Sequence, residues 1–443
     1  MLEHINSALS GYILPAVLLI CGIYLGWRLR FFYILHPLRT IRDIRDSAKV
    51  GGVSPFRALS VALAGTLGVG NITGVATAIA CGGAGAVFWM WLCAILVMSV
   101  KYAEVYLSQV FRQPDGTGGA MYYIRDGLRS IPHRWSSVIA AGFAVLICAN
   151  SLLTGTVVQM DAAVSVATGF LPESPPILWG IGFAIPVAYI AAGGLKRVSG
   201  MTVKLIPALS AVYVIISAVC IINNRSSLPD AFAKIFEGAF APAAAGGGIM
   251  GFGINSAVRY GVTRGIFSNE AGCGTSPSAH AAANAKSPHH QGCMGIFEVF
   301  ADTIVLCTVT ALVILTSGIT PTEDGMATAL DAFAISCGSV AAAVIGISVV
   351  LFAFATVICQ SFYGLGAARH LTKSVKWYRA YIIMIAISAV AGSVISAELM
   401  WGFADLIIAV MTVVNTGCIL RIFCGRPLFE KRGLPYPPPK TFK

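Results

Sequence analysis

The sequence predicts an all-helical integral membrane protein of about eleven transmembrane helices, in which one extra span precedes two inverted five-helix repeats, each opening with a broken helix. Three observations predict this fold. Hydrophobic residues form 57% of the 443-residue chain and charged residues only 11%, a composition far from that of a soluble domain. The apolar residues gather into stretches near the roughly 20 residues that a helix needs to cross a bilayer. Two of these stretches are interrupted by glycines and polar residues at corresponding places in the two halves of the chain.

Eleven apolar stretches are expected to span the membrane, and they recur along the whole chain. The N-terminus lacks the basic flank and cleavage site of a removable signal peptide, so insertion is expected through the protein's own helices. The expected spans are about residues 11–27, 58–80, 85–110, 135–168, 177–193, 203–222, 247–285, 291–317, 340–368, 377–395 and 398–420.

The positive charge of the chain follows this topology. The formal net charge is +11, and 26 of the 30 Lys and Arg side chains fall in alternate connections and in the C-terminal tail. By the positive-inside rule, the N-terminus is outside and the C-terminus is cytoplasmic, as expected of a multi-pass protein of the plasma (inner) membrane. The charge therefore reports orientation in the lipid bilayer, and no nucleic-acid partner is predicted. The basic segments are 28–57, 101–134, 194–204, Lys286, 369–379 and 421–443.

Five segments are expected along the chain. Residues 27–52 place basic side chains beside aromatic and aliphatic ones, which is typical of an interfacial cytoplasmic helix. The segments are an extra span with the interfacial helix (1–57), the first repeat (58–222), an extracellular connection (223–245), the second repeat (246–420) and a cytoplasmic tail (421–443).

Twelve cysteines are scattered singly along the chain, without a CxxC pair or a Cys/His ligand spacing. They predict neither a disulfide framework nor a zinc site.

The two interrupted stretches read "GTLGVGNITG" (65–74) and "GIFSNEAGCGTSP" (265–277), and each heads a five-span half. Both stretches contain the pattern Asn-x-x-Gly, which begins at Asn71 in the first and at Asn269 in the second. Because five is odd, the halves enter the membrane from opposite sides, and interrupted helices in such halves indicate a transporter site at the bilayer midplane. Glycines can instead serve close helix packing. Packing, however, does not require buried polar groups such as Asn71, Asn269 and Glu270.

The breaks are expected to bind ligands because they free backbone groups in the middle of the membrane. The N–H groups from Gly70 onward, at the positive end of a half-helix, suit a carboxylate. The carbonyl oxygens between Ala64 and Leu67 suit a hard monovalent cation. One molecule with a carboxylate and one cation are therefore the predicted occupants.

Several stretches together resemble the alanine or glycine:cation symporter family, which includes sodium:alanine symporters. They run over nearly all of the chain, and the first and the fourth are specific to that family. The resemblance implies the amino-acid:sodium symporter fold and import of a small neutral amino acid with sodium as the coupling ion, with no other cofactor and no enzyme activity. The stretches are "GTLGVGNITGVATAIACGGAGAVFWMW" (65–91), "KYAEVYL" (101–107), "GGAMYYI" (118–124), "YGVTRGIFSNEAG" (260–272) with "AHAAA" (279–283), and "SFYG" (361–364).

By position, the resemblance implies a site built from both breaks and two further spans. Glu270 is either a partner of the substrate amine or a brace for its half-helix. Gln159 is either a ligand or a helix–helix hydrogen-bonding group. The implied substrate-binding residues are Val69, Gly70, Asn71, Gln159, Phe267, Ser268, Asn269, Glu270, Gly272 and Gln360, and the implied cation-binding residues are Ala64, Leu67 and Thr356.

Four departures from the family pattern affect the inferred pocket. Gln360 in place of a Trp predicts a roomier cavity suited to a polar side chain such as that of serine or glutamine, beside alanine and glycine. Ala355 removes one hydroxyl from the inferred sodium site. The departures are Val69 for Thr, Asp161 for Asn, Ala355-Thr356 for a Thr-Thr pair with Gln360 for the following Trp, and Leu365 for an acidic residue.

Asp161 is the candidate for a different coupling mechanism. A carboxyl group in a low-dielectric span can carry a proton, so proton-coupled symport is the alternative to sodium symport. The other interpretations are that Asp161 completes the sodium site or serves only packing.

Other classes of function fit the sequence less well. A channel would need a continuous polar stripe or filter loop. A hydrolase would need an oriented nucleophile and base, and Ser268 and His280 have no third orienting group. An ATP-driven pump would need a phosphate loop, and GxxxxGK[ST] does not occur. A sensor that binds an amino acid without transporting it would share these sequence features and stays open, as does the oligomeric state.

Overall fold

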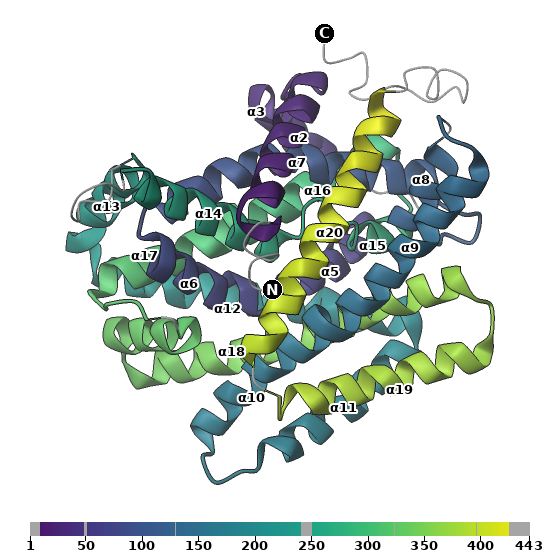
Figure 1. Ribbon diagram of the computed structural model, residues 1–443. Coiled ribbons are helices and arrows are strands. Elements are labelled where there is room, and N and C mark those ends of the chain that lie inside the picture. Colours follow the sequence, from purple (N-terminus) through teal and green to yellow (C-terminus); the bar gives the residue numbers. More distant parts are fainter. Residues whose placement is uncertain are drawn as a thin grey trace.

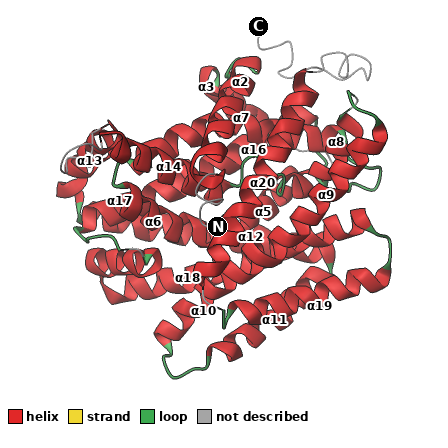
Figure 2. Cartoon of the chain, viewed as in Figure 1, coloured by secondary structure: helices red, strands yellow, loops and turns green. Residues whose placement is uncertain are grey.

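The computed structural model describes residues 9–47, 51–128, 130–240, 250–322, 324–395 and 397–424. In this part of the chain the regular secondary structure is helical, with one isolated parallel bridge between Val53 and Ala283 (Figure 2). Most of the expected tail (421–443), residues 241–245 of the expected extracellular connection and residues 246–249 of the expected second repeat lie outside the described residues.

Helices dominate because a segment surrounded by lipid can satisfy its own backbone groups only in that form. The described helices are η1 (Leu9–Ile13), α2 (Leu14–Arg28), α3 (Phe32–Leu35), α4 (Pro37–Arg45), α5 (Pro55–Thr66), η2 (Val69–Asn71), α6 (Thr73–Gly82), α7 (Ala86–Val110), α8 (Ala120–Gly127), α9 (His133–Leu152), η3 (Leu153–Val157), α10 (Val158–Phe170), α11 (Pro176–Ala192), α12 (Gly194–Asn223), η4 (Arg225–Ser227), α13 (Leu228–Phe240), α14 (Met250–Asn269), α15 (Pro277–Ala281), α16 (Pro288–Val299), η5 (Phe300–Cys307), α17 (Thr308–Ser317), α18 (Gly325–Leu371), α19 (Val375–Gly392) and α20 (Ala397–Cys424).

Each expected span coincides with a helix or with consecutive helices. The expected span 85–110, for example, corresponds to α7, and the span 135–168 corresponds to α9, η3 and α10. Among the described residues, eight helices are long and apolar enough to cross a membrane, or nine if the bent pair of α5 with η2 and α6 is one span. α11, with 17 residues, is shorter than these. The all-helical membrane fold is therefore confirmed, and the number of eleven spans remains a prediction.

Three stretches that the sequence analysis expected as connections are helical instead. α8 and α13 lie in two of them, and α18 begins at Gly325 rather than near residue 340. The Asp324 side chain caps the start of α18 by accepting the N–H groups of Met326 and Ala327, at 3.1 and 3.0 Å. Gly338 then bends α18 with a φ of 83°, which glycine adopts without steric cost.

The helices pair across the two halves of the chain. α7 packs along α16, α9 along α18, and α11 along α19 (Figure 1). In that view α11 and α19 lie side by side at the lower edge, away from α2 and α3 at the top. Each pair joins a span of one expected half with the span at the same place in the other half. This pairing agrees with two related halves, while the inverted repeat and the domain boundaries stay predictions.

Candidate functional site

The first broken helix bends sharply at its glycine-rich centre. α5 meets the helical segment that follows it at 66°, and the short turn η2 between α5 and α6 is buried. A Cβ on Gly68 would lie 2.6 Å from Gln159 Oε1 and 2.8 Å from Thr356 Oγ1, so only glycine lets both side chains approach the backbone. Gln159 Oε1 accepts the N–H of Val69 at 3.2 Å. The break is therefore lined by polar groups from two other helices.

The second break begins where α14 ends at Asn269. Positive φ angles at Glu270 (48°), Gly272 (85°) and Gly274 (76°) turn the chain away from the helix. Glu104, a buried residue of α7, accepts the N–H groups of Gly272 and Gly274 at 3.2 and 2.9 Å. This carboxyl group thus satisfies backbone donors that the unwound segment would otherwise leave unpaired.

The two breaks meet at one hydrogen-bonded cluster. Asn71 Nδ2 donates to Ser268 Oγ at 2.8 Å and to Asp302 Oδ1 at 2.7 Å. Ser268 and Thr303 donate to Asp302 Oδ2 at 2.7 and 2.8 Å, and Asn269 donates to Thr303 Oγ1 at 3.0 Å. All five side chains are buried, so this cluster connects both broken helices to η5.

An aromatic wall stands beside the cluster. A Cβ on Gly70 would lie 3.1 Å from the ring of Phe267, which packs against Trp401 at a centroid distance of 4.8 Å. The guanidinium of Arg264 lies 5.3 Å from the centroid of the Trp401 ring and 3.8 Å from the carboxylate of Asp405. These contacts join α14 to α20 next to the first break.

Gln360, on α18, ties the two breaks together. Its Nε2 donates to Glu270 Oε1 at 2.7 Å and to the carbonyl of Gly65 at 3.3 Å. Glu270 also accepts a hydrogen bond from Thr275 Oγ1. The Oε1 atom of Gln360 is buried and has no hydrogen-bond partner among the described residues. Glu270 is thus engaged within its own segment and with α18.

The implied cation-binding residues lie close together on the other side of the first break. Thr356 Oγ1 lies 3.4 Å from the carbonyl oxygen of Leu67 and 3.0 Å from that of Phe352. Ala64 is buried in the last turn of α5, and Ala355 is buried next to Thr356. One hydroxyl and one freed carbonyl oxygen therefore face each other at this position.

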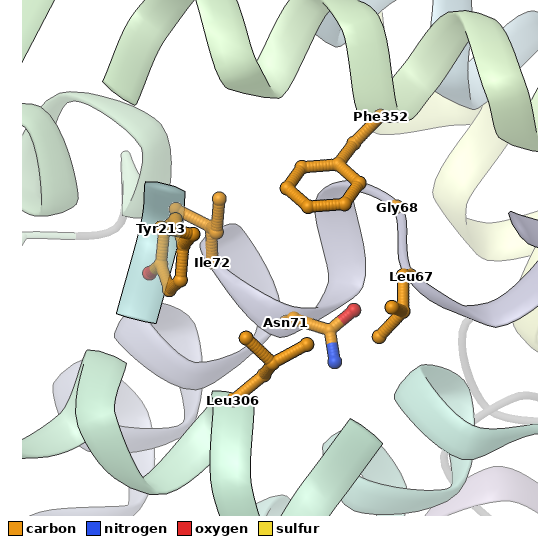
Figure 3. Close-up of a pocket in the computed structure, with 7 residues that line it drawn as sticks. All are labelled: Leu67, Gly68, Asn71, Ile72, Tyr213, Leu306 and Phe352. Carbon is orange, nitrogen blue, oxygen red and sulfur yellow. The ribbon is translucent and has the colours of Figure 1, made fainter. Parts of the chain in front are cut away.

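Two cavities adjoin the first break. The smaller one has a volume of ≈ 10 Å³, space for about one water molecule. Figure 3 shows its lining, in which Asn71 lies between Leu67, Leu306 and Ile72. The larger cavity has a volume of ≈ 410 Å³ and reaches the break at Val69. An amino acid fits only the larger of the two.

Asp161 lies apart from the cluster of the two breaks. It lines the larger cavity together with Arg264, Asp324 and Trp401, and its side chain is half-buried. Its carboxyl group makes no hydrogen bond or ion pair with another described residue. The structure therefore brings the other implied site residues around the breaks and places Asp161 on the wall of the larger cavity.

The sequence analysis missed Asp302, the acceptor at the centre of the cluster. It is one of two carboxyl groups, with Glu298, in the apolar stretch 291–317, and an ionisable residue inside a span is by itself a signal of function.

The placement of Lys101 in a basic connection was wrong. Lys101 is fully buried in α7, where its Nζ lies 3.3 Å from Glu298 Oε1 and 3.1 Å from Ser276 Oγ. His280 Nε2 lies 3.0 Å from Glu298 Oε2. Basic residues within an apolar helix of this kind balance buried acids and say nothing about topology.

Comparisons with known proteins agree along nearly the whole chain. Residues 1–424 match the sodium:alanine symporter family. An uncharacterised transporter of Haemophilus influenzae is 37% identical, over 94% of this chain and 92% of its own. The probable sodium/glutamine symporter GlnT of Bacillus subtilis is 35% identical (94% and 87%), and the sodium/alanine symporter AgcS of Methanococcus maripaludis is 34% identical (94% and 92%). A crystal structure of MhsT in complex with L-phenylalanine shares the fold, with a TM-score of 0.57 at 14% identity over 85% of this chain and 90% of that chain.

Proposed function

Because this chain belongs to the sodium:alanine symporter family, we propose that it is a secondary active importer of a small neutral amino acid that works by alternating access. Membership in this family confirms the resemblance that the motifs indicated. The chain is a multi-pass membrane protein of amino-acid:cation symport, and it is not an enzyme. The observation that carries the proposal is the hydrogen bond between Asn71 and Ser268, one from each broken helix, at 2.8 Å. Two adjacent breaks gather freed backbone donors and acceptors around one point, as a transport site requires.

The substrate carboxylate is proposed to bind at the N–H groups that follow Gly68. Val69 N–H now donates to Gln159 Oε1, an uncharged acceptor. A helix N-terminus favours an anion over a neutral acceptor. We expect the carboxylate to replace this contact and the amide nitrogen of Gln159 to donate to it.

Glu270 is proposed to act as a brace and not as the partner of the substrate amine. Its carboxyl group accepts from Gln360 Nε2 and Thr275 Oγ1, and its positive φ lies at the turn itself. A substrate amine would have to displace one of these donors. Of the two interpretations drawn from the sequence, the contacts support bracing.

The coupling cation is proposed to bind beside Asp302. This carboxyl group is fully buried, and no cationic side chain among the described residues pairs with it; Lys101 and His280 pair with Glu298 instead. An unpaired buried carboxylate costs several kcal/mol, so sodium or a proton would stabilise it. Asn71 now presents Nδ2 to Asp302, and a turn of its amide would bring Oδ1, buried without a described partner, to the cation as a second oxygen. The alternative position is the one that the resemblance implies, at Leu67 and Thr356.

Gln360 has fewer hydrogen-bonding groups left for a polar substrate than its position in the sequence predicted. Its Nε2 is engaged, so only the acceptor Oε1 remains, and it lines neither of the two cavities described above. The preference for serine or glutamine beside alanine therefore stays a proposal. The name of the relative GlnT, a probable sodium/glutamine symporter, agrees with it.

Two alternatives remain beside sodium symport. Proton coupling through Asp161 is supported by its position on the larger cavity, where no described residue holds its carboxyl group. A sensor that does not transport would bind at the same two breaks.

Uptake of radiolabelled amino acids into proteoliposomes tests the proposal. Import that depends on an imposed sodium or proton gradient is expected, for alanine, glycine, serine or glutamine. Binding of one of these amino acids without gradient-driven flux would instead identify a sensor. The absence of both binding and flux for the whole panel contradicts the proposed substrate class.

A further inference from the structure

Three metal-ligating side chains come together where α4 packs on α16. Asp43 lies on α4, and His289 and Cys293 lie on α16. His289 Nε2 is 3.2 Å from Asp43 Oδ2 and 3.6 Å from Cys293 Sγ, and the three ligand atoms lie within 4.8 Å of one another. The Cys293 side chain is fully buried, and His289 and Asp43 are 8% and 20% exposed.

Two of the three separations match the edges of a tetrahedron around zinc. Zinc binds imidazole nitrogen and carboxylate oxygen at about 2.0–2.1 Å and thiolate sulfur at about 2.3 Å. Tetrahedral angles between such bonds separate nitrogen from oxygen by about 3.3 Å and nitrogen from sulfur by about 3.6 Å. The observed separations are 3.2 and 3.6 Å. The third pair, the Asp43 oxygen and the Cys293 sulfur, lies within 4.8 Å, and these two atoms would need to stand about 3.6 Å apart around one ion.

The surroundings hold the imidazole in the orientation that coordination needs. His289 Nδ1 lies 2.8 Å from the hydroxyl of Tyr102, which leaves Nε2 on the side of Asp43 and Cys293. Zinc-bound histidines nearly always use their second nitrogen in such a hydrogen bond. The ring of Phe32 packs against His289 at a centroid distance of 5.5 Å and shields it further.

α16 carries two of the three ligands on one face. His289 and Cys293 are four residues apart, so they lie one above the other on the same face of the helix. The third ligand comes from 246 positions earlier in the chain. A spacing pattern in the sequence shows only ligands that are close along the chain. The third ligand here, Asp43, is brought to the other two by the fold, so no zinc site was predicted from the sequence.

We propose that Asp43, His289 and Cys293 form a binding site for one late first-row divalent cation, zinc in the first place. A thiolate, an imidazole and a carboxylate are the ligand types that zinc takes, with water as the fourth ligand on the partly exposed side of Asp43. Arg39 adds a positive charge within electrostatic range of His289, which the two anionic ligands outweigh.

Metal binding would fasten the short helix α4 to α16. α16 continues directly into η5, the segment that carries Asp302. The ion would therefore fix one end of the helical segment whose other end holds the cluster at the two breaks. The proposed site is independent of the transported substrate and of the coupling ion.

Cobalt(II) titration of the full-length protein tests the site without any transport measurement. The protein is purified in detergent, stripped with a chelator and titrated with Co²⁺, whose bond to a thiolate absorbs in the near ultraviolet. One equivalent of Co²⁺ per chain is expected to produce this absorption, and one equivalent of Zn²⁺ is expected to displace it. Cys293→Ser should abolish the absorption, and Asp43→Asn should weaken Co²⁺ binding by roughly tenfold or more.

Two matched variants keep the test specific. Cys21→Ser removes another buried thiol. His290→Ala removes the neighbouring histidine, whose ring lies 5.8 Å from that of His289 and whose Nδ1 contacts Ser287. Both should bind Co²⁺ as the unaltered protein does, and a melting curve checks that each variant is folded. If Cys293→Ser does not fold, Asp43→Asn carries the test alone. The proposal is wrong if one-to-one thiolate absorption does not appear, or if it persists unchanged in folded Cys293→Ser or Asp43→Asn.

Discussion

Asp302 accepts a hydrogen bond from Asn71 at 2.7 Å, across 231 positions of the sequence. Asn71 belongs to the first broken helix, and Asp302 lies in η5, in the span that follows the second break. Ser268, from the second break, contacts both residues. A change in the charge of Asp302 therefore acts on both breaks at once, as the proposed coupling of an ion to a substrate requires.

Asp302→Asn is expected to reduce cation-dependent uptake by roughly tenfold or more, equal to about 1.4 kcal/mol or more of lost binding energy. The amide keeps the size of the carboxyl group but removes the charge that would attract the cation. Uptake measured against sodium concentration and against pH checks this. Asp331→Asn changes an exposed acid on α18 and should have no effect. Unaltered sodium and pH dependence in folded Asp302→Asn would place the coupling ion elsewhere.

Gly68→Ala is expected to abolish substrate binding and to lower stability by about 1–3 kcal/mol. The added Cβ would lie within 2.8 Å of both Gln159 Oε1 and Thr356 Oγ1, so one of these side chains has to move. Binding and thermal unfolding in detergent measure the two effects. A Cβ on Gly142 would meet no atom within 4 Å, so Gly142→Ala is the control. Normal binding by Gly68→Ala would mean that the close packing at the break is dispensable.

Glu270→Ala is expected to lower the free energy of unfolding by about 1–3 kcal/mol, because it removes the acceptor of Thr275 Oγ1 and the nearer of the two acceptors of Gln360 Nε2. Glu270→Gln retains one acceptor and should be milder. The melting temperature and the affinity for the amino acid are measured together. A variant that melts normally but no longer binds would show that Glu270 meets the substrate amine after all.

Asp161→Asn is expected to remove any contribution of a pH gradient to transport and to leave binding at the two breaks intact. The residue lines the larger cavity and is not part of the hydrogen-bonded cluster. Uptake under imposed sodium and proton gradients, with and without the substitution, separates the two couplings. Full sodium dependence with no response to pH in either protein contradicts proton coupling at this position.

Uptake of serine, threonine or glutamine is expected to be at least equal to uptake of alanine. Gln360 Oε1, an acceptor without a partner among the described residues, stands where the family usually has an indole. Competition for labelled substrate across the panel measures the preference. Gln360→Leu has a similar volume without the amide, so it distinguishes polarity from size. Exclusion of all three polar amino acids, with alanine transported normally, would contradict the expectation.

The position of both breaks could be predicted from the sequence because the chemistry there is local. Gly68 and Gly272 stand in apolar stretches where a continuous helix would favour other residues, and the chain leaves its helix at both places. The helices α13 and the first part of α18 could not be predicted in the same way. α13 has apolar residues at helical spacing, but its 13 residues are too few to cross a bilayer, so a search for spans leaves it in a connection.

The partners within the site could not be predicted from the sequence, because they join distant helices. Gln360 contacts Glu270 and Gly65, and Glu104 contacts Gly272 and Gly274, in pairings set only by the packed fold. Periodicity and composition identify which residues are polar within a span. They do not tell which of those residues will meet.

The buried ion pair between Lys101 and Glu298 can form only after both residues have been synthesised. The two residues are 197 positions apart, so at about 5–20 residues per second the ribosome needs roughly 10–40 s to reach Glu298 after Lys101. During that interval α7 enters the membrane with a lysine in it, at an apparent cost of about 2.5–3.5 kcal/mol for such a charge at the helix centre. Glu104, three residues away on the same helix face, can neutralise Lys101 until α16 arrives. The nascent chain thus carries a temporary partner for a charge whose permanent partner has not yet been synthesised.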